Sequence, residues 1–155
     1  MRISNLLNRS LIIPSLAATD KLTALREITT FITTGGAPSP CSANAIYNAV
    51  INREQHGSTG VGQGVAIPHA RLAPLSELVA CFGISHSGIP YDSIDKKPVN
   101  LIFMLLVPEA SGGAHLKALA RVSRLLRNSS FREELLMLRT ADHIYEAFLA
   151  QDEKI

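Results

Sequence analysis

The feature that most constrains the fold is the uninterrupted apolar run VNLIFMLLV, from Val99 to Val107. A strand with one face in solvent alternates apolar and polar residues, whereas a strand covered on both faces is apolar throughout. The run is about half as long as the ~20 residues that a membrane-spanning helix requires. We therefore expect a central β-strand with other elements packed on both of its sides.

The segments around this run predict helices that alternate with a few further strands. Leu11–Ile13, Gly64–Ile67 and ELVACFGIS are expected to be strands, and HSGIPYDSIDKKP is expected to hold turns and a short edge strand. Strands this few do not close a barrel, so an open mixed sheet with helices on both faces is the expected α/β fold. Helices are predicted from Thr19 or Asp20 to Gly35–Gly36, from Ser42 to Arg53–Glu54, within AHLKALARVSRLLRN, from a Ser130–Glu133 capping box, and from about Ala141 to Ala150.

Apolar residues at helical spacing predict which faces of these helices are buried. The predicted inward residues are Leu22, Leu25, Ile28 and Ile32 in the first helix, Ile46, Val50 and Ile51 in the second, and Leu116, Leu119, Val122 and Leu126 in the third.

Length and composition predict a single soluble domain over residues 1–155. The net charge of +2 is too small to indicate nucleic-acid binding by itself. Cys41 and Cys81 lack the spacing of a metal site, so we expect reduced, buried thiols of a cytosolic protein. The N-terminal MRISNLLNRS has no apolar core of the kind found in secretion signals. The expected location is therefore the cytoplasm.

The stretch HGSTGVGQGVAIPHARL, residues 56–72, is rich in glycine, as phosphate-binding loops often are. Gly57 and Gly62 have the spacing of a Walker loop, but Gln63 stands where that loop has its lysine. The glycines also do not form GxGxxG, so a nucleotide site is not supported. A tight turn with close backbone packing is the alternative for such a cluster.

His69 makes a chemical role for this loop plausible. It follows a predicted strand end and Pro68, and strand ends are where open α/β sheets place their sites. Arg53 precedes the loop, which also offers backbone N–H groups and the hydroxyls of Ser58 and Thr59. A neutral imidazole can attack phosphorus while cations and N–H groups hold the charged oxygens. The pattern alone leaves a structural role for His69 open.

The segment REQHGSTGVGQGVAIPHAR strongly resembles the active-site segment of the IIA proteins of the bacterial phosphoenolpyruvate-dependent phosphotransferase system. The likeness is to the mannitol/fructose type and is greatest to its nitrogen-regulatory branch. It continues through IDKKPVNLIFMLLVPE and HLKALARVSRLLRN and covers nearly the whole chain. Local departures are His56, where the family usually has an apolar residue, and Lys96, which replaces a common glycine.

This resemblance implies a role for each site residue. His69 would be the phosphorylated residue, through Nε2, with Arg53 and His115 assisting at the phosphoryl group. Ser58, Thr59 and Gly60 are candidate phosphate-binding residues of the loop. The implied fold is a mixed sheet with helices on both sides. The implied donor is a phosphohistidine carrier, HPr or its nitrogen-branch paralogue NPr, and no nucleotide, metal or other cofactor is needed.

Two classes of function compete on this basis. The first is a regulator of nitrogen- or potassium-related processes, whose phosphorylation state governs binding to a transporter or sensor kinase. The second is a sugar-specific IIA component that passes its phosphoryl group to a IIB domain. Nucleic-acid binding ranks far below both, since only the basic helix residues Lys117, Arg121, Arg124 and Arg127 favour it. Direct membrane insertion is not expected.

Overall fold

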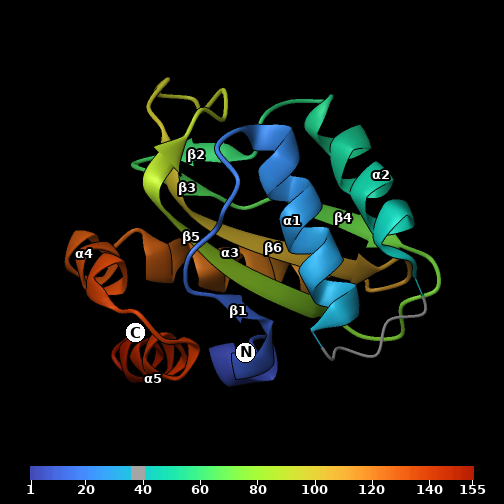
Figure 1. Cartoon of the computed structure of the whole chain (residues 1–155). Helices are drawn as coiled ribbons and strands as arrows, with labels where there is room; N and C mark the ends of the chain where they lie inside the picture. The colour runs from blue at the N-terminus through green and yellow to red at the C-terminus, as the bar shows by residue number, and fades with distance from the viewer. Residues whose placement is uncertain (36–40) are drawn as a thin grey trace.

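The protein is built around a mixed β-sheet (Figure 1), seen in a computed structural model that describes residues 1–35 and 41–155. The sheet has six strands in the order β1-β5-β6-β3-β2, and β4 also pairs with β6. The expected open mixed sheet is thereby confirmed. The strands are β1 (Ile12–Ile13), β2 (Gly60–Gly62), β3 (Val65–Ala66), β4 (His69–Leu72), β5 (Val79–Ile89) and β6 (Val99–Pro108).

Strand β6 lies at the centre of the sheet, as its apolar sequence predicts. It is antiparallel to β5 and parallel to both β3 and β4. Its side chains alternate between two cores that lie on opposite faces of the sheet. Leu101, Phe103 and Leu105 enter one core, and Ile102, Met104 and Leu106 enter the other.

The helices cover both faces, with α1 and α2 in front of the sheet and α3 behind it in Figure 1. Buried residues of α1 and α2 share a core with Ile102, and those of α3, α4 and α5 share the other core with Phe103. The chain ends are joined because the backbone N–H of Ile3 donates to the Asp152 carboxylate at 2.9 Å. The helices are α1 (Lys21–Thr34), α2 (Ala43–Glu54), α3 (Ala114–Leu126), α4 (Ser129–Met137) and α5 (Ala141–Asp152).

The predicted caps are confirmed at α1 and α2 but not at α4. Asp20 and Ser42 accept hydrogen bonds from backbone N–H groups in the first turns of their helices. At α4 the capping residue is Asn128, whose side chain accepts from the N–H of Phe131, so the predicted Ser130 cap is wrong. Asparagine is a strong N-cap residue, and capping at 128 places Phe131 in the core.

Two residues predicted to face inward are exposed: Leu22 by 55% and Leu116 by 61%. Each precedes a buried residue, Ile28 or Val122, by six positions. That separation corresponds to a rotation of about 120° when each residue turns a helix by ~100°. The first three predicted inward residues of each set are spaced three apart, which is less than one helical turn. The first residue of each set therefore lies on a different face of the helix from the buried residues.

Two further predictions concern an edge strand after β5 and the end of α1. The predicted separate edge strand is a continuation of β5, which runs to Ile89 after an irregularity in its pairing with β6. Gly35 ends α1 as predicted, whereas Gly36 lies outside the described residues. Within residues 1–35 and 41–155, every helix is too short or too polar to span a bilayer.

Candidate active site

His69 stands at a break in the edge of the sheet. Strands β3 and β4 follow one another along the same side of β6, and Ile67 and Pro68 separate them. The Pro68 carbonyl accepts the N–H of Leu105 at 2.9 Å, which fixes the break against β6. His69 therefore follows a strand end and Pro68, as predicted, and is also the first residue of β4.

One ring nitrogen of His69 is held by the chain itself. Nδ1 lies 3.0 Å from the carbonyl oxygen of Ile67. A carbonyl oxygen can only accept a hydrogen bond, so Nδ1 carries the proton of the neutral ring and donates it. The lone pair then lies on Nε2, the nitrogen that the resemblance assigns to phosphoryl transfer.

Burial is the main reason that the pKa of His69 is lower than that of a free histidine, because the half-buried ring is poorly solvated when charged. The hydrogen bond to Ile67 and the carboxylate of Glu54 oppose this shift, whereas Arg53 and His115 add to it. The lowered pKa favours a neutral, nucleophilic ring at neutral pH.

The fold brings together the three residues predicted to carry the chemistry. Arg53 lies in the last turn of α2, and one of its guanidinium nitrogens donates to the Gly57 carbonyl at 3.0 Å. His115 lies in the first turn of α3, after the connection from β6. The charges of both act on the His69 ring, although α2 and α3 cover opposite faces of the sheet.

His115 is held in the same tautomer as His69 and has a cationic neighbour. Its Nδ1 lies 3.1 Å from the Gly112 carbonyl, so this nitrogen is the donor and Nε2 bears the lone pair. A guanidinium nitrogen of Arg71 lies 3.1 Å from that Nε2. Arg71 was not among the predicted site residues.

A buried carboxylate supports the loop between α2 and β2. Glu54 is 9% exposed and accepts hydrogen bonds from the backbone N–H and the hydroxyl of Thr59. Its other partners are the Lys21 ammonium, at 2.9 Å, and the hydroxyl of buried Tyr91, at 3.4 Å. A buried charge needs such partners, because an unpaired one costs several kcal/mol.

The candidate phosphate-binding residues of the loop have internal partners in this structure. The Ser58 hydroxyl donates to the Tyr91 carbonyl at 3.0 Å and accepts the N–H of Gly60 at 3.1 Å. Thr59 is 5% exposed, and its carbonyl accepts the N–H of Ile67 at 3.0 Å. Contact of these donors with a phosphoryl group requires them to share or exchange partners, so that role stays a prediction.

The glycine-rich stretch forms a hairpin. Strands β2 and β3 pair in an antiparallel manner. Gly62 at the end of β2 and the turn residues Gln63 and Gly64 have φ values of 97°, 58° and 80°. Glycine adopts this left-handed region without strain, which explains two of the glycines by turn geometry. Gly60 is explained by packing, because a Cβ there would lie 2.4 Å from the Ser93 hydroxyl oxygen.

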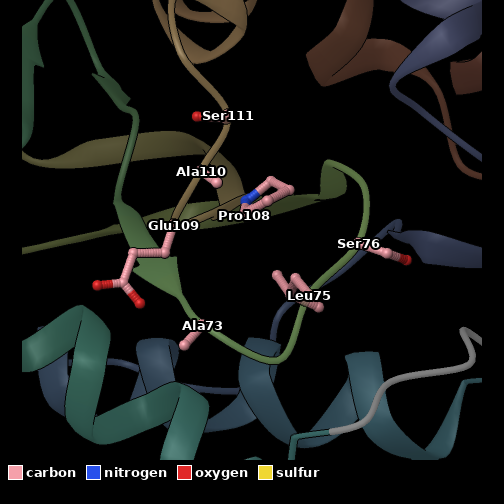
Figure 2. Close-up of a pocket in the computed structure, with 7 residues that line it drawn as sticks. All are labelled: Ala73, Leu75, Ser76, Pro108, Glu109, Ala110 and Ser111. Atoms are coloured by element: carbon pink, nitrogen blue, oxygen red, sulfur yellow. The ribbon is translucent and has the colours of Figure 1, made fainter.

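A hollow of about 560 Å³ lies beside the site, between the β4–β5 and β6–α3 connections (Figure 2). His69, which is half-buried, is not among the residues that line it. Among the described residues, no three His, Cys, Asp or Glu side chains gather as metal ligands. The lining residues are Ala73, Leu75, Ser76, Pro108, Glu109, Ala110 and Ser111.

Sequence reasoning missed Arg71 as well as Glu54 and its partners Lys21 and Tyr91. For Arg71 the signal was present, because it stands two residues after His69 on a strand and therefore shares its face. For Glu54 the adjacent Arg53 was the only local hint. Lys21 and Tyr91 come from distant parts of the chain, and the fold alone places them near Glu54.

The sequence of this chain is similar to those of known proteins. The family described as "Phosphoenolpyruvate-dependent sugar phosphotransferase system, EIIA 2" matches residues 5–151. A "Nitrogen regulatory protein" of Bradyrhizobium diazoefficiens is 37% identical over 145 residues, which cover 94% of this chain and 93% of that protein. A "PTS system fructose-specific EIIABC component" of Bacillus subtilis is 34% identical over 152 residues, covering 98% of this chain and 24% of that protein.

Comparison of structures agrees with the sequence matches. The crystal structure of nitrogen regulatory protein IIA-Ntr from Neisseria meningitidis is similar, with a TM-score of 0.87 and 32% identity. The match covers 94% of this chain and 98% of that one. The resemblance seen along nearly the whole sequence is thus confirmed, and the chain belongs to the EIIA type 2 family of the phosphoenolpyruvate-dependent sugar phosphotransferase system.

Proposed function

We propose that this protein is a phosphocarrier that accepts a phosphoryl group on Nε2 of His69 from a phosphohistidine protein of the HPr or NPr class. The observation that carries the proposal is the hydrogen bond from Nδ1 to the Ile67 carbonyl, because it leaves the nucleophilic lone pair on Nε2. The phosphorus–nitrogen bond of the donor breaks as the bond to Nε2 forms. The Nδ1 proton stays on the hydrogen bond to Ile67 while positive charge develops on the ring.

The surrounding groups would stabilise the transferring phosphoryl group. Its charged oxygens need cations and N–H donors, because transfer passes through a loose transition state. Arg53 would supply positive charge from the α2 side of the sheet, and His115 would supply it from the α3 side in its protonated form. Ser58, Thr59 and Gly60 supply hydroxyl and N–H donors if the loop exchanges its internal hydrogen bonds during transfer.

For the protein as a whole, regulation in the cytoplasm is the role that the relatives favour. Both the B. diazoefficiens and the N. meningitidis relatives are named nitrogen regulatory proteins. The phosphorylation state of His69 would then govern binding to a regulatory target, such as a transporter or sensor kinase of nitrogen or potassium metabolism. The B. subtilis relative favours the second candidate, a sugar-specific IIA component that passes phosphate to a IIB domain.

The acceptor chemistry is tested by comparing phosphoryl sources. Incubation with phosphoenolpyruvate, the first enzyme of the system and an HPr-class protein should add one acid-labile phosphate to the chain. ATP alone should add none, because Gln63 stands where a Walker loop has lysine. Efficient labelling from ATP without the carriers would contradict the proposal.

The two roles are separated by following the phosphate onward. Purified phosphorylated protein is mixed with a fructose-type IIB domain, and the phosphate on each protein is measured over time. Retention on this chain supports the regulatory role. Rapid transfer to the IIB domain supports the sugar-specific candidate instead.

A further inference from the structure

Arg71 projects from the same face of β4 as His69. The intervening Ala70 and the following Leu72 are buried in the core shared with α1 and α2. Because side chains alternate along a strand, His69 and Arg71 point to the opposite face, where α3 lies. The two residues start about 7 Å apart, at ~3.3 Å per residue, so an arginine side chain can reach the ring.

The guanidinium of Arg71 is already positioned by two contacts. One nitrogen donates to the Glu109 carbonyl at 3.1 Å, and another lies 3.1 Å from Nε2 of His115. The arginine thus links β4 to the connection between β6 and α3. In Figure 2 this connection, with Glu109, forms one wall of the hollow beside the site.

The contacts of His115 determine which hydrogen-bond donors a phosphoryl group would meet there. With its Nδ1 proton on the Gly112 carbonyl, neutral His115 presents a lone pair at Nε2 and no N–H there. The donors at that point belong to the guanidinium of Arg71. Arg71 therefore supplies N–H donors at the point where neutral His115 supplies none.

We propose that Arg71 binds the phosphoryl group carried by His69, an inference that rests on the proposed phosphocarrier function. When the group arrives on Nε2 of His69, the guanidinium nitrogen now at His115 donates to a phosphoryl oxygen. The other guanidinium nitrogen of Arg71 keeps its hydrogen bond to the Glu109 carbonyl, which limits how far the arginine side chain moves. Arg71 exchanges hydrogen-bond partners and neither gains nor loses a proton.

The loss of Arg71 should slow transfer moderately. A buried donor to a developing oxyanion contributes ~10²–10³-fold, but Arg71 is exposed, and solvent weakens its interactions. We expect Arg71→Ala to lower the rate at saturating donor by about tenfold. Arg71→Lys should restore part of that rate, because lysine keeps the charge but lacks the planar fork.

Arg139→Ala is the matched control. Arg139 is also exposed and also lies against a histidine ring, with contacts of 3.2 and 3.3 Å to His86. Arg139 belongs to the connection between α4 and α5. The substitution Arg139→Ala removes the same charge from the chain as Arg71→Ala does. Single-turnover transfer from a phosphorylated HPr-class donor is measured for each variant over a range of donor concentrations, together with its melting temperature.

The expected result is a lower saturating rate for Arg71→Ala, partial recovery in Arg71→Lys, and a wild-type rate for Arg139→Ala. A folded Arg71→Ala protein with the wild-type rate would overturn the role of Arg71 and leave phosphorylation of His69 standing. Equal slowing in Arg71→Ala and Arg139→Ala would also overturn it, because net charge would explain both. An unlabelled wild-type protein would overturn the proposed function itself.

Discussion

The proton on Nδ1 of His69 determines which ring nitrogen can attack phosphorus. The Ile67 carbonyl holds this proton, and partial burial lowers the pKa of the ring. Both effects favour a neutral ring with its lone pair on Nε2. The reactive state is thus present at neutral pH without a separate general base.

We predict that His69 titrates at lower pH in the folded protein than in the unfolded chain, where the pKa should be about 6.5. The sign follows from burial, which disfavours the charged ring and lowers its pKa. Ring nitrogen signals of His69 are followed by NMR against pH, in buffer and in urea. Above the folded midpoint, the spectrum should show the tautomer protonated at Nδ1.

Arg53→Gln provides the control for this titration. The positive charge of Arg53 contributes to lowering the His69 pKa, so its removal should move the midpoint upward. A folded midpoint equal to or above that in urea would contradict the account. A neutral ring protonated at Nε2 would contradict the assignment of the nucleophile.

The sequence alone points to the three residues proposed to carry the chemistry, because they lie in short motifs. Arg53 and His69 lie in one recognisable segment, and His115 opens a further segment of the same pattern. Arg71 was missed because its importance depends on a contact with His115, which is far away in the sequence. Strand alternation would have placed Arg71 beside His69, but not beside His115.

At the level of elements, hydrogen bonds connect the loop before the β2–β3 hairpin to His69, the proposed acceptor. The carbonyl of Thr59 accepts the N–H of Ile67, and the carbonyl of Ile67 accepts Nδ1–H of His69. Gly60 follows Thr59 and packs tightly against Ser93. A displacement of Gly60 should therefore change the orientation of the His69 ring.

We predict that Gly60→Ala destabilises the protein by about 1–3 kcal/mol, the usual cost of overpacking, and slows phosphorylation of His69. The added Cβ would lie 2.4 Å from the Ser93 oxygen and 2.9 Å from the Ser93 Cα, so backbone has to move. Urea unfolding and the rate of labelling are measured. Gly113→Ala is the control, because nothing lies within 4 Å of its added Cβ. Equal behaviour of the two variants would show that Gly60 is not tightly packed.

Element types could be predicted better than their ends and faces. The apolar run in β6 and the capped helices have strong local signals. The Ser130 cap failed because Asn128 offered a better capping group two residues earlier. Lys96, which departs from a common family glycine, adopts a φ of 60°. That conformation favours glycine, and the sequence of this chain carries no local sign of it.

For the whole molecule, the site exists where its two layers meet. Arg53 and Glu54 come from α2 on one face of the sheet, and His115 comes from α3 on the other. His69 lies between them on the strand that pairs with the end of β6. The composition predicted a folded domain, but the meeting of these residues required the topology, which local patterns do not contain.

The central claim is that His69 alone accepts the phosphoryl group and that the surrounding cations only assist. Its most direct test is mass spectrometry of the chain after labelling, under mildly basic conditions that preserve phosphohistidine. We predict phosphate on His69 in the wild type and none in His69→Ala. In Arg53→Ala and His115→Ala, His69 should still be phosphorylated, but ~10²–10³-fold more slowly, because each variant loses one group that stabilises the transition state. Phosphate on His115 in the wild type, or full labelling of His69→Ala, would contradict the account.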